Sequence, residues 1–360
     1  MKKGKVEDKS QETSKAQIQV KEYYSPGSAQ NRVNDVLITR NSIYLATPQG
    51  VLEIDPLSHE VLNQSDPYLK EQNILQMGIG ANGTLYANSE KKGLMALPPG
   101  ATDFYSTDST KMRDFFIPEN TDNVYCATSH GIDILKAGVW TNIKVKGIAE
   151  FQNQANDLQT IVGDKQGKLW IGSSFGLYIM QASGGFDFFY GNFQIIQGNT
   201  IINRKGNSPL SGNLVYDISI DPASNGVLIG TNGGATWISD SSKIRQMSNW
   251  KVFTADHTTS TMYAGQIQVR EVPGNSPLPI NFVKTVRAYS NQLYLGTESG
   301  LAHFYNGQWE VLDMDKGLSA DSIMSIKIHD KGTQPIVYLG TNGGITILPF
   351  HPTLKEKEGS

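Results

Sequence analysis

The segments LYLGTESGLAHF (293–304) and VYLGTNGGITIL (337–348) each hold a short apolar strand ending in a small residue, a tight turn with glycine, and a second strand. The same pattern occurs five more times, as IYLATPQGVLEI (43–54), LYANSEKKGLMAL (85–97), VYCATSHGIDIL (124–135), LWIGSSFGLYIM (169–180) and VLIGTNGGATWI (227–238). The small residues lie 40 to 66 positions apart, at Ala46, Ala87, Ala127, Gly172, Gly230, Gly296 and Gly340. A period of about 40 to 45 residues with several strands per unit is typical of a propeller. The sequence therefore predicts an all-β fold, a seven-bladed β-propeller.

The two ends of the chain predict how the ring closes. The seventh unit stops at ITILPF (345–350) and lacks an outer strand, whereas IQVKEYY (18–24) has the alternation of an outer strand but no blade of its own. Pairing the two removes an exposed strand edge that would favour aggregation. We therefore predict a ring closed by an N-terminal strand that completes the last blade.

This reading divides the chain into a leader (1–16), a propeller (17–350) and a polar tail (351–360). The leader MKKGKVEDKSQETSKA is too polar to offset its ordering entropy by burial, so we expect it to be flexible. A charged leader before a compact β-domain is what a removed secretion or lipoprotein signal leaves behind. We therefore expect an extracytoplasmic location, in the periplasm or on the outer-membrane surface, with a lipid anchor before residue 1 as one option. The chain has no apolar run long enough to span a membrane.

Composition and motifs exclude several classes of function. A net charge of −3 gives no basic surface for nucleic acid. The single Cys126 excludes an internal disulfide and a thiolate metal cluster. The six histidines have no HxxxH or HExxH spacing, and the sequence contains no GxSxG or P-loop motif. We therefore predict no catalytic residue, no metal and no cofactor.

A ligand, if bound, is expected where loops from all blades converge around the central channel. The turns between second and third strands lie on that rim and carry Gln49, Lys91, Lys92, His130, Phe175, Asn232, Glu298 and Asn342. Amides, charges and one aromatic ring suit a glycan or a peptide. The alternative is that these are solvated turn residues without a ligand.

Two long gaps between units predict extra hairpins at about 192–212 and 257–279. Both contain alternating apolar residues around Gly and Pro turns. Our hypothesis is that they dock a partner protein through Ile195, Ile196, Ile201, Ile202, Met262, Tyr263, Ile267 and Val269. The alternative is that the hairpins only thicken their own blades.

The stretch DKQGKLWIGSSFGLYIM (164–180) resembles the two-component regulator propeller repeat, and 293–304 and 337–348 match it well. Unit two departs most, because NSEKKG lengthens its turn. The resemblance implies a ring of the kind found in extracytoplasmic sensor parts of bacterial hybrid two-component proteins. This sequence contains no kinase segment, so the resemblance implies a recognition ring without phosphotransfer.

From these observations we predict a non-enzymatic recognition or scaffold propeller of the bacterial cell envelope. Its partner would be a protein or a glycan fragment, bound alone or within a larger sensory or envelope assembly. The alternative is a propeller-type lyase or hydrolase with a polar site at the channel mouth. For that alternative His130, in an inter-strand turn, is better placed than His303 on a third strand.

Overall fold

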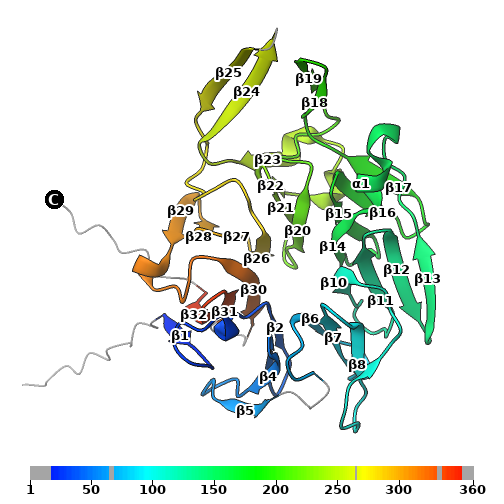
Figure 1. Cartoon of the computed structure of the whole chain (residues 1–360), viewed down its shortest axis with the longest axis vertical. Helices are drawn as coiled ribbons and strands as arrows, with labels where there is room; N and C mark the ends of the chain where they lie inside the picture. The colour runs from blue at the N-terminus through cyan, green and yellow to red at the C-terminus, as the bar shows by residue number, and fades with distance from the viewer. Residues whose placement is uncertain (1–17, 65–68, 264–265, 331–334, 351–360) are drawn as a thin grey trace, which may run out of the picture.

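The computed structural model describes residues 18–64, 69–263, 266–330 and 335–350. Seven four-stranded antiparallel sheets stand around a central axis, which confirms the predicted seven-bladed propeller (Figure 1). The leader (1–16) and the tail (351–360) lie outside the described residues. No helix in the described ranges is both long and apolar enough to cross a membrane.

The first three blades follow one another without insertion. Blade 1 consists of β2 (Asp35–Ile38), β3 (Ile43–Thr47), β4 (Gly50–Ile54) and β5 (Val61–Gln64). Blade 2 consists of β6 (Ile74–Ile79), β7 (Leu85–Ser89), β8 (Gly93–Leu97) and β9 (Tyr105–Ser106). Blade 3 consists of β10 (Met112–Phe116), β11 (Val124–Thr128), β12 (Gly131–Lys136) and β13 (Val139–Ile143).

The remaining four blades include the one that closes the ring. Blade 4 consists of β14 (Leu158–Gly163), β15 (Leu169–Ser173), β16 (Gly176–Met180) and β17 (Phe186–Phe189), and blade 5 of β20 (Val215–Ile220), β21 (Val227–Thr231), β22 (Gly234–Ile238) and β23 (Trp250–Phe253). Blade 6 consists of β26 (Thr285–Tyr289), β27 (Gln292–Thr297), β28 (Gly300–Tyr305) and β29 (Gln308–Leu312). Blade 7 consists of β30 (Ile323–His329), β31 (Ile336–Thr341), β32 (Gly344–Pro349) and β1 (Gln19–Lys21).

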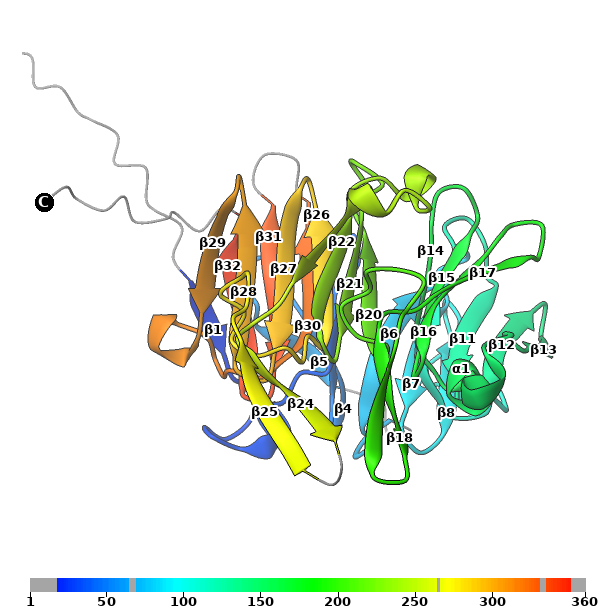
Figure 2. The ribbon, with the colours of Figure 1, turned by 90° about the horizontal axis from the view of Figure 1, so that it is seen from above.

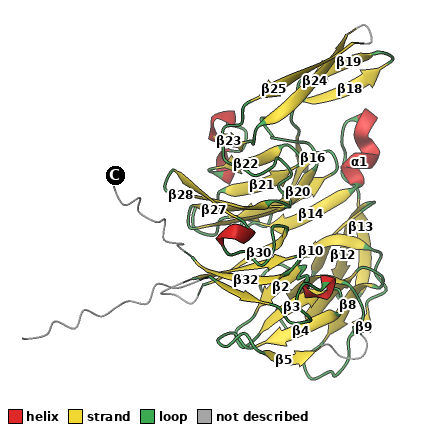
Figure 3. Cartoon of the chain, turned by 60° about the vertical axis from the view of Figure 1, so that its left-hand side comes forward, coloured by secondary structure: helices red, strands yellow, loops and turns green. Residues whose placement is uncertain are grey.

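Helices occur only in connections of the described chain, where Figure 3 shows them in red. The α-helix α1 (Gln152–Asn156) links blades 3 and 4. The short 3-10 helices are η1 (Ala29–Asn31), η2 (Ala149–Phe151), η3 (Ser241–Lys243), η4 (Met247–Asn249) and η5 (Met314–Lys316).

The N-terminal strand closes the ring as predicted. β1 pairs antiparallel with β32, with Gln19 opposite Ile347 and Lys21 opposite Ile345. Gly344, at φ +134°, has so little space that a Cβ would lie 2.5 Å from the Lys21 carbonyl oxygen. Gly300 of the continuous blade 6 has the same restriction, 2.5 Å from the Leu312 oxygen. The strand from the other end of the chain thus takes the position that a fourth strand has elsewhere.

The hydrophobic core is divided among the seven interfaces between neighbouring blades. One cluster joins blades 7 and 1, for example, where Tyr338 and Ile345 pack with Val36 and Leu45. Both faces of the middle strands are covered in this way, which explains their nearly continuous apolar sequences. Because most apolar side chains pack between blades, the residues that line the central channel are mostly polar.

Two further hairpins stand outside the blades. β18 (Phe193–Gln197) pairs with β19 (Thr200–Arg204), and β24 (His257–Tyr263) pairs with β25 (Gln266–Val272). Each forms a two-stranded sheet that adds no strand to a blade. They lie side by side, and the Gln194 side chain donates a hydrogen bond to the Ser260 carbonyl at 3.4 Å. Figure 2 shows both projecting from the side of the ring where α1 also lies.

Candidate functional site

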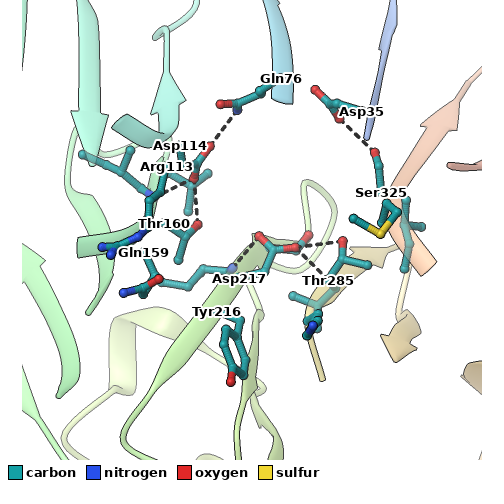
Figure 4. Close-up of a pocket in the computed structure, with 18 of the residues that line it drawn as sticks. Asp35, Gln76, Arg113, Asp114, Gln159, Thr160, Tyr216, Asp217, Thr285 and Ser325 are labelled. Carbon is teal, nitrogen blue, oxygen red and sulfur yellow. Dashed lines mark hydrogen bonds between the residues drawn. The ribbon is translucent and has the colours of Figure 1, made fainter. Parts of the chain in front are cut away.

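A ring of seven polar residues surrounds the channel near the start of the inner strands. Each member lies opposite one residue of the second strand of its own blade. The pairs are Asp35 with Ala46, Gln76 with Asn88, Asp114 with Ala127, Thr160 with Gly172, Asp217 with Gly230, Thr285 with Gly296, and Ser325 with Gly340. We call these seven the inner ring, and Figure 4 shows all of them.

Close packing explains why each unit of the sequence repeat has a small residue near the end of its second strand. A Cβ on Gly172 would lie 2.5 Å from Cγ1 of Val215 in the next blade and 2.7 Å from Cγ2 of Thr160. The inner strands therefore approach the second strands too closely for larger side chains. In blade 2 the structure corrects the sequence alignment, because Asn88, and not Ala87, occupies this position. The longer turn of that unit shifts the register by one residue.

Three carboxylates of the inner ring each bind the backbone of the next blade. Asp114 Oδ2 accepts from Ile161 N at 2.8 Å, and Asp217 Oδ2 accepts from Val286 N at 2.8 Å. Asp35 Oδ2 accepts from Met77 N at 3.1 Å. Charge-assisted bonds of this kind are stronger than neutral ones. These aspartates therefore act as clasps between blades 1 and 2, 3 and 4, and 5 and 6.

The hydroxyl and amide members complete these clasps (Figure 4). Thr160 Oγ1 donates to Asp114 Oδ2 at 2.8 Å, and Gln76 Nε2 donates to Asp114 Oδ1 at 2.6 Å. Ser325 Oγ donates to Asp35 Oδ1 at 2.8 Å across the junction of blades 7 and 1. Inner-ring side chains of the described structure are thus hydrogen-bonded across five of the seven blade junctions, those between blades 7 and 1, 1 and 2, 2 and 3, 3 and 4, and 5 and 6.

Burial in the channel perturbs two of these carboxyl groups. Burial raises the pKa of Asp217 to about 7, although the Val286 N–H opposes this shift, and the charge of Asp114 adds to it. Burial likewise raises the pKa of Asp114, against the Ile161 N–H bond. Desolvation disfavours a charged carboxylate, which is the physical cause in both cases. Near neutral pH Asp217 is therefore partly protonated.

A cavity of about 340 Å³ runs along this channel. Two cations of its lining lie two residues beyond the inner ring, Lys327 in blade 7 and Arg287 in blade 6. Lys327 Nζ lies 3.0 Å from Asp35 Oδ1. The Arg287 Nε atom, in contrast, is buried and has no hydrogen-bond partner in the described chain. Burial lowers the pKa of Arg287, and the charge of Asp217 opposes that effect.

The eight residues predicted for the rim lie in the turns between second and third strands. These turns are at the channel-mouth end, because the second strands end there, next to their pairs with the inner ring. Of the residues lining the described channel cavity, none belongs to this set of Gln49, Lys91, Lys92, His130, Phe175, Asn232, Glu298 and Asn342. Glu298 forms an ion pair with Lys284, which does line the cavity. Their binding role stays a prediction.

Two rim residues have clear intramolecular contacts. His130 Nε2 lies 3.3 Å from Asp133 Oδ2. Phe175 is only 6% exposed, because its ring stacks on Phe151 with centroids 4.1 Å apart and meets Phe193 edge-on at 5.3 Å. The aromatic side chain of this turn is thus covered by the protein itself, and it contacts the base of hairpin β18–β19.

The hairpin residues proposed for docking differ in exposure. Ile196, Ile267 and Val269 are 75%, 66% and 63% exposed. Ile195, Ile201 and Ile202 are half-buried. The side chains of Met262 and Tyr263 are outside the described part, although both residues belong to β24.

Sequence reasoning did not identify the inner ring. The available signal was a polar residue near the start of each apolar inner strand, such as Asp35 in VNDVLIT and Asp217 in VYDISI. Of the two histidines considered for catalysis, His303 is buried, and its Nε2 donates a 2.7 Å hydrogen bond to Gln292 Oε1. Among the described residues no group of three or more His, Cys, Asp or Glu side chains is arranged to hold a metal ion.

No model of a protein family matches this sequence, and no curated protein matches it either. Solved structures do. The structure is similar to virginiamycin B lyase from Staphylococcus aureus, with a TM-score of 0.63, 9% identity, and coverage of 93% of this chain and 100% of that one. At such identity the likeness concerns the fold.

Two further similar structures are an extracellular domain and a bacterial surface component. The extracellular domain of a putative hybrid two-component system from B. thetaiotaomicron has a TM-score of 0.64 at 16% identity, over 92% of this chain and 39% of that one. PorZ, a surface component of the type-IX secretion system of Porphyromonas gingivalis, has a TM-score of 0.59 at 13% identity, over 90% and 47%. This chain thus spans less than half of either. The three similar structures are a lyase, an extracellular domain of a two-component system and a secretion-system component, so the likeness concerns the fold and not one function.

Proposed function

We propose that this chain is a non-enzymatic recognition propeller of the bacterial cell envelope that binds a partner protein through its paired hairpins. The surface formed by β18–β19 and β24–β25 is called the hairpin platform below. The observation that carries the proposal is the exposure of Ile196, Ile267 and Val269 on a structure that stands apart from the blades. Apolar side chains gathered on an exposed surface are typical of protein interaction sites.

The base of the platform supports this role. Phe193, the first residue of β18, packs edge-on against Phe151 at 5.4 Å and against the buried Phe175 at 5.3 Å. The Gln194–Ser260 hydrogen bond joins the two hairpins. A surface that is held in place loses less conformational freedom on binding, so more of its interaction energy becomes affinity.

The similar structures support the location. The similar part of the two-component protein is an extracellular domain, and PorZ is a bacterial surface component. These two likenesses support our proposal that the chain acts outside the cytoplasm, within a sensory or secretory assembly.

The experiment is site-specific photo-crosslinking in the native bacterium. A crosslinking amino acid at position 269 or 196 should capture the same discrete protein, and I196R together with V269R should abolish this capture. Val139, 62% exposed on the outer strand of blade 3, provides the matched control position. Equal capture from position 139, or no specific capture from 196 and 269, would contradict the proposal.

A further inference from the structure

Among the described residues, one cation that lines the channel cavity has hydrogen-bond donors without a protein partner. Four cationic side chains line the cavity, and three of them form ion pairs: Arg113 with Asp157, Lys284 with Glu298, and Lys327 with Asp35. Arg287 is the fourth. Within the described ranges it has neither a hydrogen bond nor an ion pair, and its Nε is buried. An arginine presents five N–H donors, so a half-buried one without acceptors is costly to the fold.

The neighbouring carboxylates do not supply the missing acceptor. Asp217 Oδ2 is occupied by Val286 N at 2.8 Å and Thr285 Oγ1 at 3.1 Å, and its Oδ1 accepts from Ile218 N at 2.8 Å. Asp114 is occupied in the same way by Gln76, Thr160 and Ile161. Both serve as clasps between blades. An acceptor for Arg287 would therefore have to come from outside the chain.

The cavity also has an apolar part. The residues two positions beyond the inner ring are Arg287 and Lys327 in blades 6 and 7 but Phe116 and Val162 in blades 3 and 4. Phe116 and Val162 are half-buried and line the same cavity. The cationic blades and the apolar blades lie on different sides of the ring, as the positions of β10, β14, β26 and β30 in Figure 1 show. A volume of about 340 Å³ is within the usual range for small-molecule pockets.

We propose that the channel binds a small organic acid, whose carboxylate pairs with Arg287 and whose apolar body rests against Phe116 and Val162. A carboxylate matches the planar fork of a guanidinium in a bidentate way. This site is separate from the hairpin platform, so it does not depend on the partner protein proposed above.

The test is isothermal titration calorimetry of the full chain with benzoate, using benzamide and inorganic phosphate as comparison probes. Benzoate should bind more tightly than benzamide, which has the same ring without the charge, and more tightly than phosphate, which has charge without the ring. R287M should weaken benzoate binding by about tenfold or more, the range expected for loss of a charged hydrogen-bond donor. K284M should change it less than about twofold, because Lys284 is paired with Glu298 at the channel mouth.

Thermal unfolding distinguishes binding from a structural role. Without a ligand R287M should melt no lower than the wild type, since the substitution removes a half-buried charge that has no partner among the described residues. R287K provides a second variant, and it should keep part of the affinity because it keeps the charge without the fork. Absence of benzoate binding at 10 mM, equal binding of benzamide, equal binding of phosphate, or unchanged binding by R287M would each overturn the proposal.

Discussion

The inner ring and the hairpin platform are built from opposite chemistry. In the ring, polar side chains such as Asp114 and Thr160 point into the molecule and bond to one another across blades. In the platform, apolar side chains such as Ile267 and Val269 face solvent. The polar side chains of the inner ring hold neighbouring blades together. The exposed apolar side chains of the platform, in contrast, are available for contact with another molecule. Changes to the ring should therefore cost stability, and changes to the platform should not.

The largest effect is expected where the ring is closed. Removing residues 1–24 takes β1 from blade 7 and removes Tyr23 and Tyr24, which pack against the cluster of blades 7 and 1. We expect the free energy of unfolding, measured in urea, to fall by about 5 kcal/mol, as for loss of several buried apolar side chains. A synthetic peptide of residues 17–25 should restore part of it. Unchanged stability would show that the ring holds without its closing strand.

A single clasp should matter less than the closing strand. D114A removes the acceptor of the Ile161 N–H, of the Thr160 hydroxyl and of one N–H of Gln76 Nε2, which keeps its bond to the Phe115 carbonyl. We expect a loss of about 3 kcal/mol in urea denaturation, because unsatisfied buried groups keep their desolvation cost. E119A, at an exposed acidic residue just after the same strand, is the control and should change stability by less than about 0.5 kcal/mol. Similar losses in both variants would contradict the role of Asp114 as a clasp.

Asp217 of the inner ring should make the free energy of unfolding depend on pH. The pKa of Asp217 is raised in the folded protein to about 7, above the unfolded value of about 4. Between these two values the folded state binds the proton more tightly, so this group makes stability fall as pH rises from about 4 to about 7 and has no further effect above. Denaturation of the wild type and of D217N at pH 5, 6, 7 and 8 measures this contribution of Asp217 to the free energy of unfolding. The difference in unfolding free energy between wild type and D217N should decline across this window, and a constant difference would contradict the perturbed pKa.

The smallest effect is expected in the platform. Replacing β24–β25 (257–272) by a short Gly-Ser linker removes a sheet that is separate from every blade. We expect the unfolding free energy to change by less than about 1 kcal/mol, since exposed residues contribute little to stability. Crosslinking at position 196 should be lost in the same protein. A large loss of stability would show that the hairpins support the ring and are not a separate surface.

The repeat made the fold predictable because packing between blades imposes the same demands seven times. The small residues, the glycine turns and the unpaired outer strand at the N-terminus each answer a local requirement that a sequence can reveal. Unit two shows the limit, since a turn lengthened by one residue moved Asn88 into the position expected for Ala87. The longer turn NSEKKG is visible in the sequence, but the resulting one-residue shift in strand pairing was established only by the structure.

The site was less predictable than the fold. In the sequence, Asp217 and Arg287 are two polar residues within largely apolar strands. They meet at the channel only because the closed ring places the seven inner strands around one axis. Phe175 is a second example. The rings that cover it, Phe151 and Phe193, come from segments before and after its own hairpin, so a single repeat does not show that it is covered. Which side chains meet, and which of them stay unpaired, follows from closure of the ring and cannot be read from any single repeat.

The antiparallel pairing of β1 with β32 has a mechanical consequence. Gln19 lies opposite Ile347, so the outward ends of the two strands leave blade 7 at the same edge. A pulling force applied between them would load the backbone hydrogen bonds one after another and peel the strand off at low force. Blade 7 is therefore the point at which tension between the two ends of the chain would first open the ring.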